Sequence, residues 1–443
     1  MKALNWSFPK LLLLTFAFIS VVFFLSFKWV NNQWRYNIAS DGKGYYVYLP
    51  AAFIYHDFSY QFTKYTEEKY YPGDVQPSVA QFPSGQKLNK YFVGEAVLLM
   101  PFFFVAYFLS YLFQFPIDGY SFIFQASVSV AALFYALAGL YMLSKFLKHF
   151  IASDNIISLV LLLVFLGSNL LHYTWMEPSM SHVYSFFAIS VFMAFSADFF
   201  TFKNKAKLLL LIAIFGIICL IRPVNALIIF TLPFIWMLLK IRSPFAIIIQ
   251  SKMTVLLGFL LFGAILFLQL LLYKLQIGQW WTWAYANEGF NFSHPHFSEL
   301  VFSFRKGWLV YTPIAFISIV SAIPMWRKNV VLLLAFLMPL VIIVYVASSW
   351  HDWAYGASYG CRPMTEYIGF VIIPLALSLQ TIKNYLFKAI LVFSTWCLLL
   401  LNCVQVYQIN KHILLWDNMS FKAYKASFLK TSDGHVNMLE QIE

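Results

Sequence analysis

Charged residues are scarce in this chain of 443 residues, in which Asp, Glu, Lys and Arg together make up 11%. Soluble domains carry about a quarter charged residues, so this composition excludes an ordinary soluble domain. Cysteine is also rare: the four cysteines show no CxxC spacing, and three of them lie in apolar stretches (Cys219, Cys361, Cys397 and Cys403 in all). The sequence therefore predicts neither a disulfide framework nor a zinc site.

Short signatures of nucleotide-dependent and zinc-dependent enzymes are missing as well. The chain has no Walker A motif, no GxGxxG and no HExxH, so nucleotide use and zinc hydrolysis have no support. No cofactor is predicted.

Apolar residues are abundant instead, with 61% hydrophobic and 20% aromatic side chains. Many segments are long enough to cross a bilayer, where helices satisfy the backbone hydrogen bonds internally. The predicted fold class is all-α, a polytopic transmembrane helical bundle. The net charge of +12 does not indicate a nucleic-acid partner, because basic residues of membrane proteins gather in cytoplasmic loops. Membrane lipids are the expected surroundings.

The distribution of basic residues predicts the topology. If all basic clusters lie on one side, residues 92–113 cannot cross the membrane. That segment contains Gly94, Glu95 and Pro101, so we expect it to lie along, or dip into, the outer leaflet. Two short amphipathic juxtamembrane pieces are expected at residues 45–55 and 57–65. Eleven spans remain: 10–30, 120–147, 156–171, 183–202, 208–221, 224–239, 254–273, 308–326, 330–347, 365–379 and 386–409.

This topology divides the chain into one transmembrane domain, residues 1–410, and a short polar external tail, residues 411–443. External loops are expected at residues 31–115, 275–307 and 347–363. The first apolar run lacks a small-residue cleavage site, so we expect an uncleaved span with a cytoplasmic N-terminus. A basic chain rich in Lys, Phe and Ile suggests a bacterial inner-membrane protein, with its active site on the periplasmic face.

Two acids on the predicted external face are candidate catalytic groups. Asp41 lies in Ser40-Asp41-Gly42, which is either a turn dipeptide or a carboxylate base that removes a proton from an acceptor hydroxyl. Glu95 begins an apolar helix, where the helix dipole favours an acid. A carboxylate near hydrocarbon also usually faces a cavity, so Glu95 is a second catalytic candidate.

Cations on the same face are candidate phosphate ligands. Arg222, Arg305, Lys306 and Arg362 lie outside, against the positive-inside bias, and the planar arginine fork suits bidentate phosphate contact. Simple snorkelling of a long side chain at the membrane edge is the alternative. Further substrate-site candidates in the external loops are Lys43, Tyr45, Glu177, His182, Trp350, His351, Asp352 and Tyr359.

The order of these motifs resembles that of the polytopic GT-C glycosyltransferases. The likeness is to the branch that contains protein O-mannosyltransferases and the lipid A aminoarabinose transferase. It rests on Ser40-Asp41-Gly42, Tyr91-Phe92-Val93-Gly94-Glu95, Arg222-Pro223, the segment Lys306-Gly307-Trp308 to Tyr311-Thr312-Pro313, and the loop Trp353 to Arg362. Each motif is short, so the specificity lies in their order along most of the chain.

The resemblance implies a sugar donor linked to polyprenyl phosphate and an inverting displacement at the anomeric carbon. Asp41 would be the base, and an outer arginine, above all Arg362, would hold the leaving phosphate. The acceptor would be a hydroxyl of a protein, lipid or glycan. Many relatives have a second acid where this chain has Gly42, which leaves a divalent metal open. The sequence predicts neither the sugar nor the oligomeric state.

Other functions remain open at this point. An O-antigen ligase or polysaccharide polymerase would use His351 or His182 as its base. A flippase for lipid-linked oligosaccharides would also surround a lipid phosphate with cations, and a non-catalytic subunit of a membrane complex would need no base at all.

Overall fold

The computed structural model describes residues 7–73, 77–81, 85–286 and 288–432. Nearly all regular structure in these residues is helical, which confirms the predicted all-α class. The described strands form one antiparallel pair of two residues each, β1 (Ala80–Gln81) and β2 (Lys87–Leu88).

The helices follow one another through the chain with short connections, and some of them are π or 3-10 turns, labelled η. The first third contains α1 (Phe8–Phe23), η1 (Phe24–Lys28), η2 (Gln33–Tyr36), α2 (Asp41–Tyr46), α3 (Tyr48–Phe53), α4 (Phe62–Tyr70), α5 (Gly94–Leu112) and α6 (Phe122–Leu147). The middle third contains α7 (Asp154–Leu166), α8 (Leu170–Trp175), α9 (His182–Phe202), α10 (Lys205–Ile221), η3 (Pro223–Thr231), α11 (Leu232–Leu238), α12 (Pro244–Ile249) and α13 (Lys252–Ile277). The last third contains α14 (Phe297–Phe302), α15 (Trp308–Tyr311), α16 (Pro313–Val320), α17 (Ile323–Lys328), α18 (Val330–Ser348), η4 (Arg362–Tyr367), α19 (Ile368–Val371), α20 (Ile373–Thr381), α21 (Tyr385–Asn410) and α22 (Phe421–Ser427).

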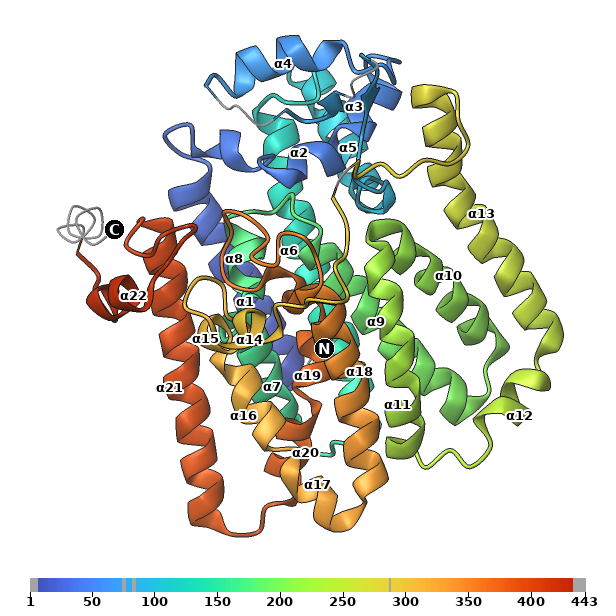
Figure 1. Cartoon of the computed structure of the whole chain (residues 1–443), viewed down its shortest axis with the longest axis vertical. Helices are drawn as coiled ribbons and strands as arrows, with labels where there is room; N and C mark the ends of the chain where they lie inside the picture. Colours follow the sequence, from blue (N-terminus) through green and yellow to red (C-terminus); the bar gives the residue numbers. More distant parts are fainter. Residues whose placement is uncertain (1–6, 74–76, 82–84, 287, 433–443) are drawn as a thin grey trace, which may run out of the picture.

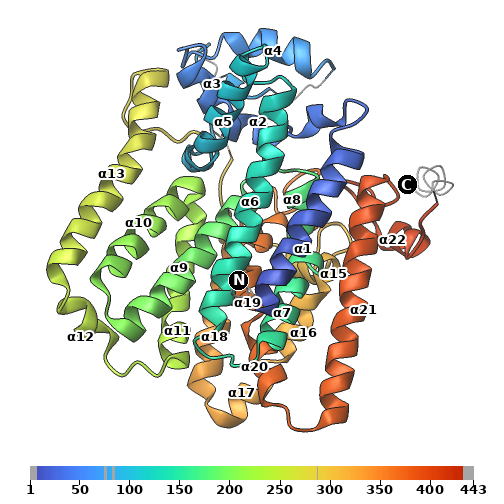
Figure 2. The same cartoon turned by 180° about the vertical axis from the view of Figure 1, so that it is seen from behind.

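Helix α9 forms the centre of the bundle and packs against α6 and α10. Within its most apolar stretch 83% of the residues are buried, against 17% for α13 at the rim. The fully buried Ser185, Ser190 and Ser196 give α9 small side chains along its length, which let neighbouring helices approach closely. The core therefore lies around α9, and α13 and α21 stand at the periphery (Figures 1 and 2).

Eight described helices or helix pairs are long and apolar enough to cross a membrane, and three shorter apolar helices accompany them. This indicates a multi-pass membrane protein. Each of the eleven predicted spans contains helix, but eleven crossings stay a prediction. Helix α5 is itself among the eight. It lies in the upper part of the molecule beside α2 and α3, whereas α6 and α21 run through much of its height (Figures 1 and 2).

The two ends of the bundle differ in composition. One end carries α2, α3 and α4, and we call it the Asp41 end; the other carries α12, α17 and the turn between α20 and α21 (Figure 1). His149 and Lys207 both contact Asp198, at 3.1 and 3.3 Å, which joins the end of α6 to the α9–α10 turn. Trp236 of α11 contacts Phe200 of α9 in the same region. The basic residues near the end of α6 and in the α9–α10 turn, which the topology argument placed on one side of the membrane, are thus close to one another, opposite the Asp41 end.

The juxtamembrane helices differ from the expected positions. The predicted piece at residues 57–65 is wrong, because the chain turns through residues 57–61 and α4 begins only at Phe62. Asp57 explains the delay: its carboxylate accepts hydrogen bonds from the backbone N–H groups of Ser59 and Gln61, each at 2.8 Å. Such Asp turns compete with helix formation.

The described part of the C-terminal tail folds back on the bundle. Gln408 donates to the carbonyls of Ser427 and Lys430, at 2.6 and 2.8 Å, which fixes α22 against the end of α21. The Ser358 N–H also donates to the Trp416 carbonyl at 3.1 Å. Residues 433–443 of the predicted tail lie outside the described residues.

Gly94 supports a close contact between α5 and α10. A Cβ atom there would lie 2.6 Å from the Leu220 carbonyl oxygen, which belongs to rigid backbone. We expect Gly94→Ala to lower the free energy of unfolding by about 1–3 kcal/mol, through overpacking. Chemical unfolding in detergent micelles would measure this. The control is Gly263→Ala on the peripheral α13, where no atom lies within 4 Å of the new methyl group; equal destabilisation by both changes would contradict the account.

Candidate functional site

Asp41 is the first residue of α2 and follows a strained backbone position. Ser40 has φ 50° and ψ −136°, a region that non-glycine residues rarely occupy and that costs about 1–3 kcal/mol. Gly42 follows, and its missing Cβ is required because Ser179 packs directly on its backbone. The Ala39 N–H donates to the Ser179 hydroxyl at 3.3 Å. The loop before α9 therefore holds Asp41 in place, and no second acid fits at position 42.

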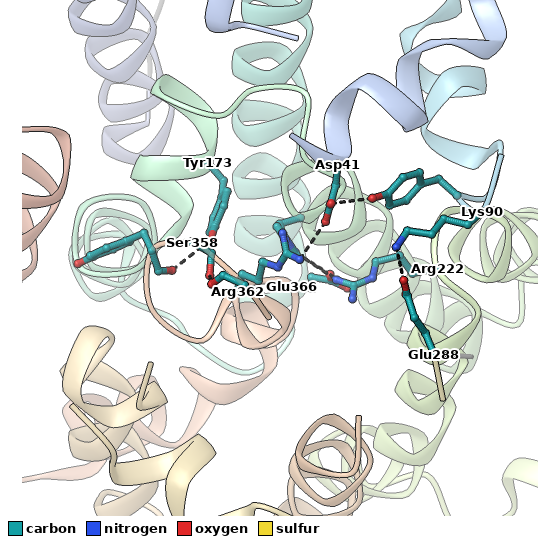
Figure 3. Close-up of polar contacts among 12 residues, drawn as sticks. Asp41, Lys90, Tyr173, Arg222, Glu288, Ser358, Arg362 and Glu366 are labelled. Atoms are coloured by element: carbon teal, nitrogen blue, oxygen red, sulfur yellow. Dashed lines mark hydrogen bonds and ion pairs between the residues drawn. The ribbon is translucent and has the colours of Figure 1, made fainter. Parts of the chain in front are cut away.

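The carboxylate of Asp41 contacts two side chains from distant segments (Figure 3). The Tyr91 hydroxyl donates to Asp41 Oδ1 at 2.6 Å, and Arg362 Nη2 lies 2.9 Å from Oδ2. Burial raises the pKa of Asp41, but the Arg362 guanidinium and the Tyr91 hydrogen bond outweigh burial, so the pKa lies below its ordinary value. Asp41 is thus ionised at neutral pH.

A second ion pair involves Arg222, which joins α10 to η3. Its Nη1 lies 2.5 Å from Glu366 Oε1 in η4 and 3.3 Å from His182 Nδ1 in α9. His182 Nδ1 also contacts Glu366 at 2.9 Å. Asn225 donates to the other Glu366 oxygen and accepts from the Tyr367 hydroxyl at 2.8 Å. Glu366 is fully buried, and an unpaired charge there would be costly. This network fixes Arg222 beside Asp41 and Arg362 (Figure 3).

Both arginines keep unused donors. Their side chains are 19% exposed for Arg222 and 16% for Arg362. Each binds its carboxylate through one terminal nitrogen, and within the described residues the other guanidinium nitrogens have no hydrogen-bond partner. Arg362 also faces the Tyr355 ring at 5.9 Å. A guanidinium has five N–H groups, so the pair can still bind an anion.

Glu95 lies in the first turn of α5, fully buried. Neither of its carboxyl oxygens has a hydrogen-bond partner among the described residues. Glu95 lies within electrostatic reach of Asp41 and Tyr45. The predicted catalytic candidate Glu95 is therefore close to Asp41 but has no access to solvent.

Loop residues 278–286 and 288–296 border the site on another side. Glu288 pairs with Lys90 at 2.6 Å, and the Lys90 ammonium faces the rings of Tyr91 and Tyr285 at 5.6 and 5.7 Å. The Trp350 ring contacts Tyr285 at 5.6 Å, and Phe290 forms a β-bridge with Trp350. The predicted candidate Trp350 thus connects two of the loops that were predicted to be external, at the edge of the site.

Lys43 and Tyr45 point from α2 into the protein. Lys43 is almost fully buried, with its ammonium 5.2 Å from the Tyr71 ring centre. The Tyr45 ring contacts Tyr91 at 4.6 Å, and burial raises the pKa of Tyr45 to about 12. Tyr45 and Tyr91 therefore line the carboxylate with neutral phenols.

Arg305 and Lys306 have other partners. Arg305 binds Asp417 of the tail through two nitrogens, at 2.9 and 3.2 Å. Lys306 is buried, and its ammonium donates to the carbonyls of Ser358 and Trp416. These contacts favour a structural role for both cations.

The remaining candidates lie around this centre. Glu177 is 3.4 Å from His172; burial raises the pKa of Glu177, but the His172 contact outweighs it and lowers the pKa overall. Tyr359 is fully buried and donates to Asn402 at 3.1 Å, toward α21. His351 is exposed, and its backbone N–H donates to the Gly289 carbonyl at 2.9 Å. Asp352 lies near Arg305.

One motif needs its structural context. Residues 356–360 read Gly-Ala-Ser-Tyr-Gly, which matches the GxSxG pattern of serine hydrolases. That pattern requires a sharp strand-to-helix turn with an exposed serine. Ser358 instead lies in an irregular loop, is buried, and places its hydroxyl 3.4 Å from the Gly356 carbonyl. The match does not form a nucleophile elbow.

Sequence reasoning missed Glu366, Tyr91 and Asn225. Glu366 carried a usable signal, because it falls within the predicted span at residues 365–379. Acids inside spans are rare and usually functional. Tyr91 begins the quoted motif Tyr91-Phe92-Val93-Gly94-Glu95 but was not named as a site residue, and Asn225 carried no comparable signal.

Comparisons of this chain with protein-family models, with curated proteins and with solved structures found no match. The site therefore has to be interpreted from its own chemistry.

The Asp41–Arg362 pair predicts a measurable energetic coupling. A double-mutant cycle with Asp41→Asn and Arg362→Gln should give a coupling of about 1–3 kcal/mol at pH 7. Because the folded pKa of Asp41 lies below its ordinary value of 3.8, this stability is present above that value and is lost as pH falls through the folded pKa. Chemical unfolding in micelles measures it.

The exposed Arg305–Asp417 pair serves as the matched control. Both side chains are about one-third exposed, so its coupling should stay below about 1 kcal/mol. If the effects of Asp41→Asn and Arg362→Gln on the free energy of unfolding were simply additive, the predicted coupling between these two side chains would be contradicted.

Proposed function

We propose that this protein is a membrane glycosyltransferase that moves a sugar from a polyprenyl-phosphate donor to an acceptor hydroxyl. The observation that carries the proposal is one ionised carboxylate, Asp41, held 2.9 Å from Arg362 with Arg222 in the neighbouring ion-pair network. A base and a phosphate ligand are thus adjacent at one end of an apolar helical bundle. The motif order that resembles GT-C enzymes adds support from the sequence.

The reaction is a single inverting displacement. The acceptor oxygen attacks the anomeric carbon while the bond from that carbon to the phosphate oxygen breaks. The acceptor proton goes to Asp41, and the electron pair leaves with the polyprenyl phosphate. Asp41 suits this task because it is ionised before the reaction, and a positioned base contributes roughly 10²–10⁴ in rate. The Tyr91 hydroxyl at 2.6 Å orients the carboxylate.

The two arginines stabilise the leaving phosphate. Charge develops on that group in the transition state, and fixed donors aimed at it are usually the largest catalytic contribution. Arg222 is fixed by Glu366 and His182, so its free nitrogens need little reorganisation. Arg362 contacts Asp41 directly, which couples the base to the phosphate site. Glu366 acts as a positioning residue, since it touches Arg222 and not the reacting atoms.

The membrane setting fits a lipid-linked donor. The site is at the Asp41 end of helices long enough to cross a bilayer, and a polyprenyl chain would remain in hydrocarbon while its phosphate reached the arginines. We propose the periplasmic face of a bacterial inner membrane for this end, because the basic clusters gather at the other.

Replacing the base should stop transfer. We expect Asp41→Asn to lower the rate at least 100-fold per folded protein molecule; the folded fraction is measured beside the rate, because the change also breaks the ion pair with Arg362. The test uses purified protein in liposomes, a panel of synthetic polyprenyl-phosphate sugars and a bacterial membrane extract as acceptor. Mass spectrometry measures the released polyprenyl phosphate. Wild-type activity in this variant would contradict the proposal and favour a ligase with His351 or His182 as base. Movement of donor across liposomes without acceptor would favour a flippase.

Replacing the phosphate ligand should weaken donor binding. We expect Arg222→Gln to raise the KM for the donor about 10- to 100-fold, because a hydrogen bond to a charged group contributes about 1.5–3 kcal/mol. The double variant Arg222→Gln/Glu366→Gln removes the orphaned buried carboxylate, so it should recover stability without recovering donor affinity. Arg242→Gln, an exposed arginine next to α12, is the control. If both KM and kcat were unchanged in the Arg222 variants, Arg222 would be excluded from the phosphate site.

A further inference from the structure

Residues of the first turns of α21 line two adjoining hollows. This part of α21 lies at the end of the molecule opposite Asp41 (Figures 1 and 2). The first of the two, of about 480 Å³, is an open hollow lined by residues of α7, the turn before it, the end of α20 and α21. The second, of about 450 Å³, continues along the outer side of α21. Lys388 and Val392 line both hollows, so the two form one continuous site around these residues, which we call the α21 groove.

The polar part of the α21 groove has an excess of positive charge. The ammonium group of Lys388 makes no ion pair or hydrogen bond with the described residues, and Lys383 is a second exposed lysine five residues earlier. The residues that line the two hollows include no acid, and Asp154, which lies beside the lining residues Ser153 and Asn155 in the sequence, pairs with Lys148 at 3.3 Å. The Gln380 amide is occupied by the backbone of Ala152 and Phe150, at 2.7 and 2.8 Å. The groove therefore offers a cation without a counter-ion.

The rest of the α21 groove is apolar and faces outward. Leu159, Leu379 and Val392 form the inner wall. Further along α21, Phe393 is 70% exposed and Trp396 43% exposed, and both line the second hollow. Lys388 and Trp396 are eight residues apart, which is about 12 Å of helix. A ligand of matching shape has a compact anionic head and an extended apolar chain.

The expected position of the start of α21 in the membrane agrees with a ligand that has an anionic head and an apolar chain. Tyr385, 86% exposed at the start of α21, is a residue type that concentrates at the membrane–water interface. Lysines near a leaflet surface attract anionic lipids. A lipid phosphate beside Lys388 would lie at headgroup depth, with its acyl chain along α21.

The geometry points to a binding site for an anionic glycerophospholipid in the α21 groove, with the phosphate on Lys388 and an acyl chain against Val392, Phe393 and Trp396. The site is independent of the proposed sugar donor, which would bind at the other end of the bundle. Such a lipid fills the space between α7 and α21, two helices that already contact each other, and so stabilises the packing of the peripheral α21.

Native mass spectrometry of the full chain in detergent tests this site, with phosphatidylglycerol as the anionic probe and phosphatidylcholine as the zwitterionic one. Wild-type protein should bind phosphatidylglycerol more tightly. Lys388→Gln should weaken that binding about five-fold, which corresponds to about 1 kcal/mol for one lysine, and leave phosphatidylcholine binding unchanged. Lys425→Gln, an exposed lysine on α22, controls for the change in total charge.

A second variant examines the apolar wall. Val392→Trp fills the shared part of both hollows without changing charge, so it should weaken binding of both lipids. Equal affinity of wild type for the two lipids, or an unchanged affinity for phosphatidylglycerol in both Lys388→Gln and Val392→Trp, would overturn the proposal.

Discussion

Charges that leave water must be paired, and this constraint organises the Asp41 end of the protein. An uncompensated buried charge costs several kcal/mol. Asp41 meets Arg362 at 2.9 Å, and Arg222 meets the fully buried Glu366 at 2.5 Å. His182 joins the second pair from the central helix. Four segments that are far apart in the sequence are thus held at one point, and the helices between them are packed to keep them there.

The same pairing gives the site its chemical character. Arg362 lowers the pKa of Asp41 and keeps the carboxylate ionised, while each arginine retains donors that no described residue uses. A site of two arginines and one carboxylate is ready for an anion on one side and a hydroxyl on the other. The strained Ser40 and the Gly42–Ser179 contact add rigidity at Asp41, which suits the proposed role of this carboxylate as a base.

Much of this arrangement was accessible from the sequence, and the rest depended on tertiary contacts. Composition predicts the all-α membrane class because a bilayer permits few other folds. Asp41, Arg222, His182 and Arg362 were predicted from their charge on one predicted face. Glu366 was missed because it was read as part of an apolar span. Arg305 and Lys306 were grouped with the phosphate ligands by charge alone; their partners Asp417 and Trp416 lie more than a hundred residues away, and no local pattern indicates such a pairing.

The position of a bound donor phosphate tests the central claim most directly. A cryo-electron microscopy structure of Asp41→Asn with a polyprenyl-phosphate sugar would trap the donor before transfer. The account predicts the phosphate within about 3 Å of guanidinium nitrogens of Arg222 and Arg362, with the anomeric carbon toward residue 41. Phosphate density at Arg305 and Lys306 instead, or at the α21 groove alone, would contradict it.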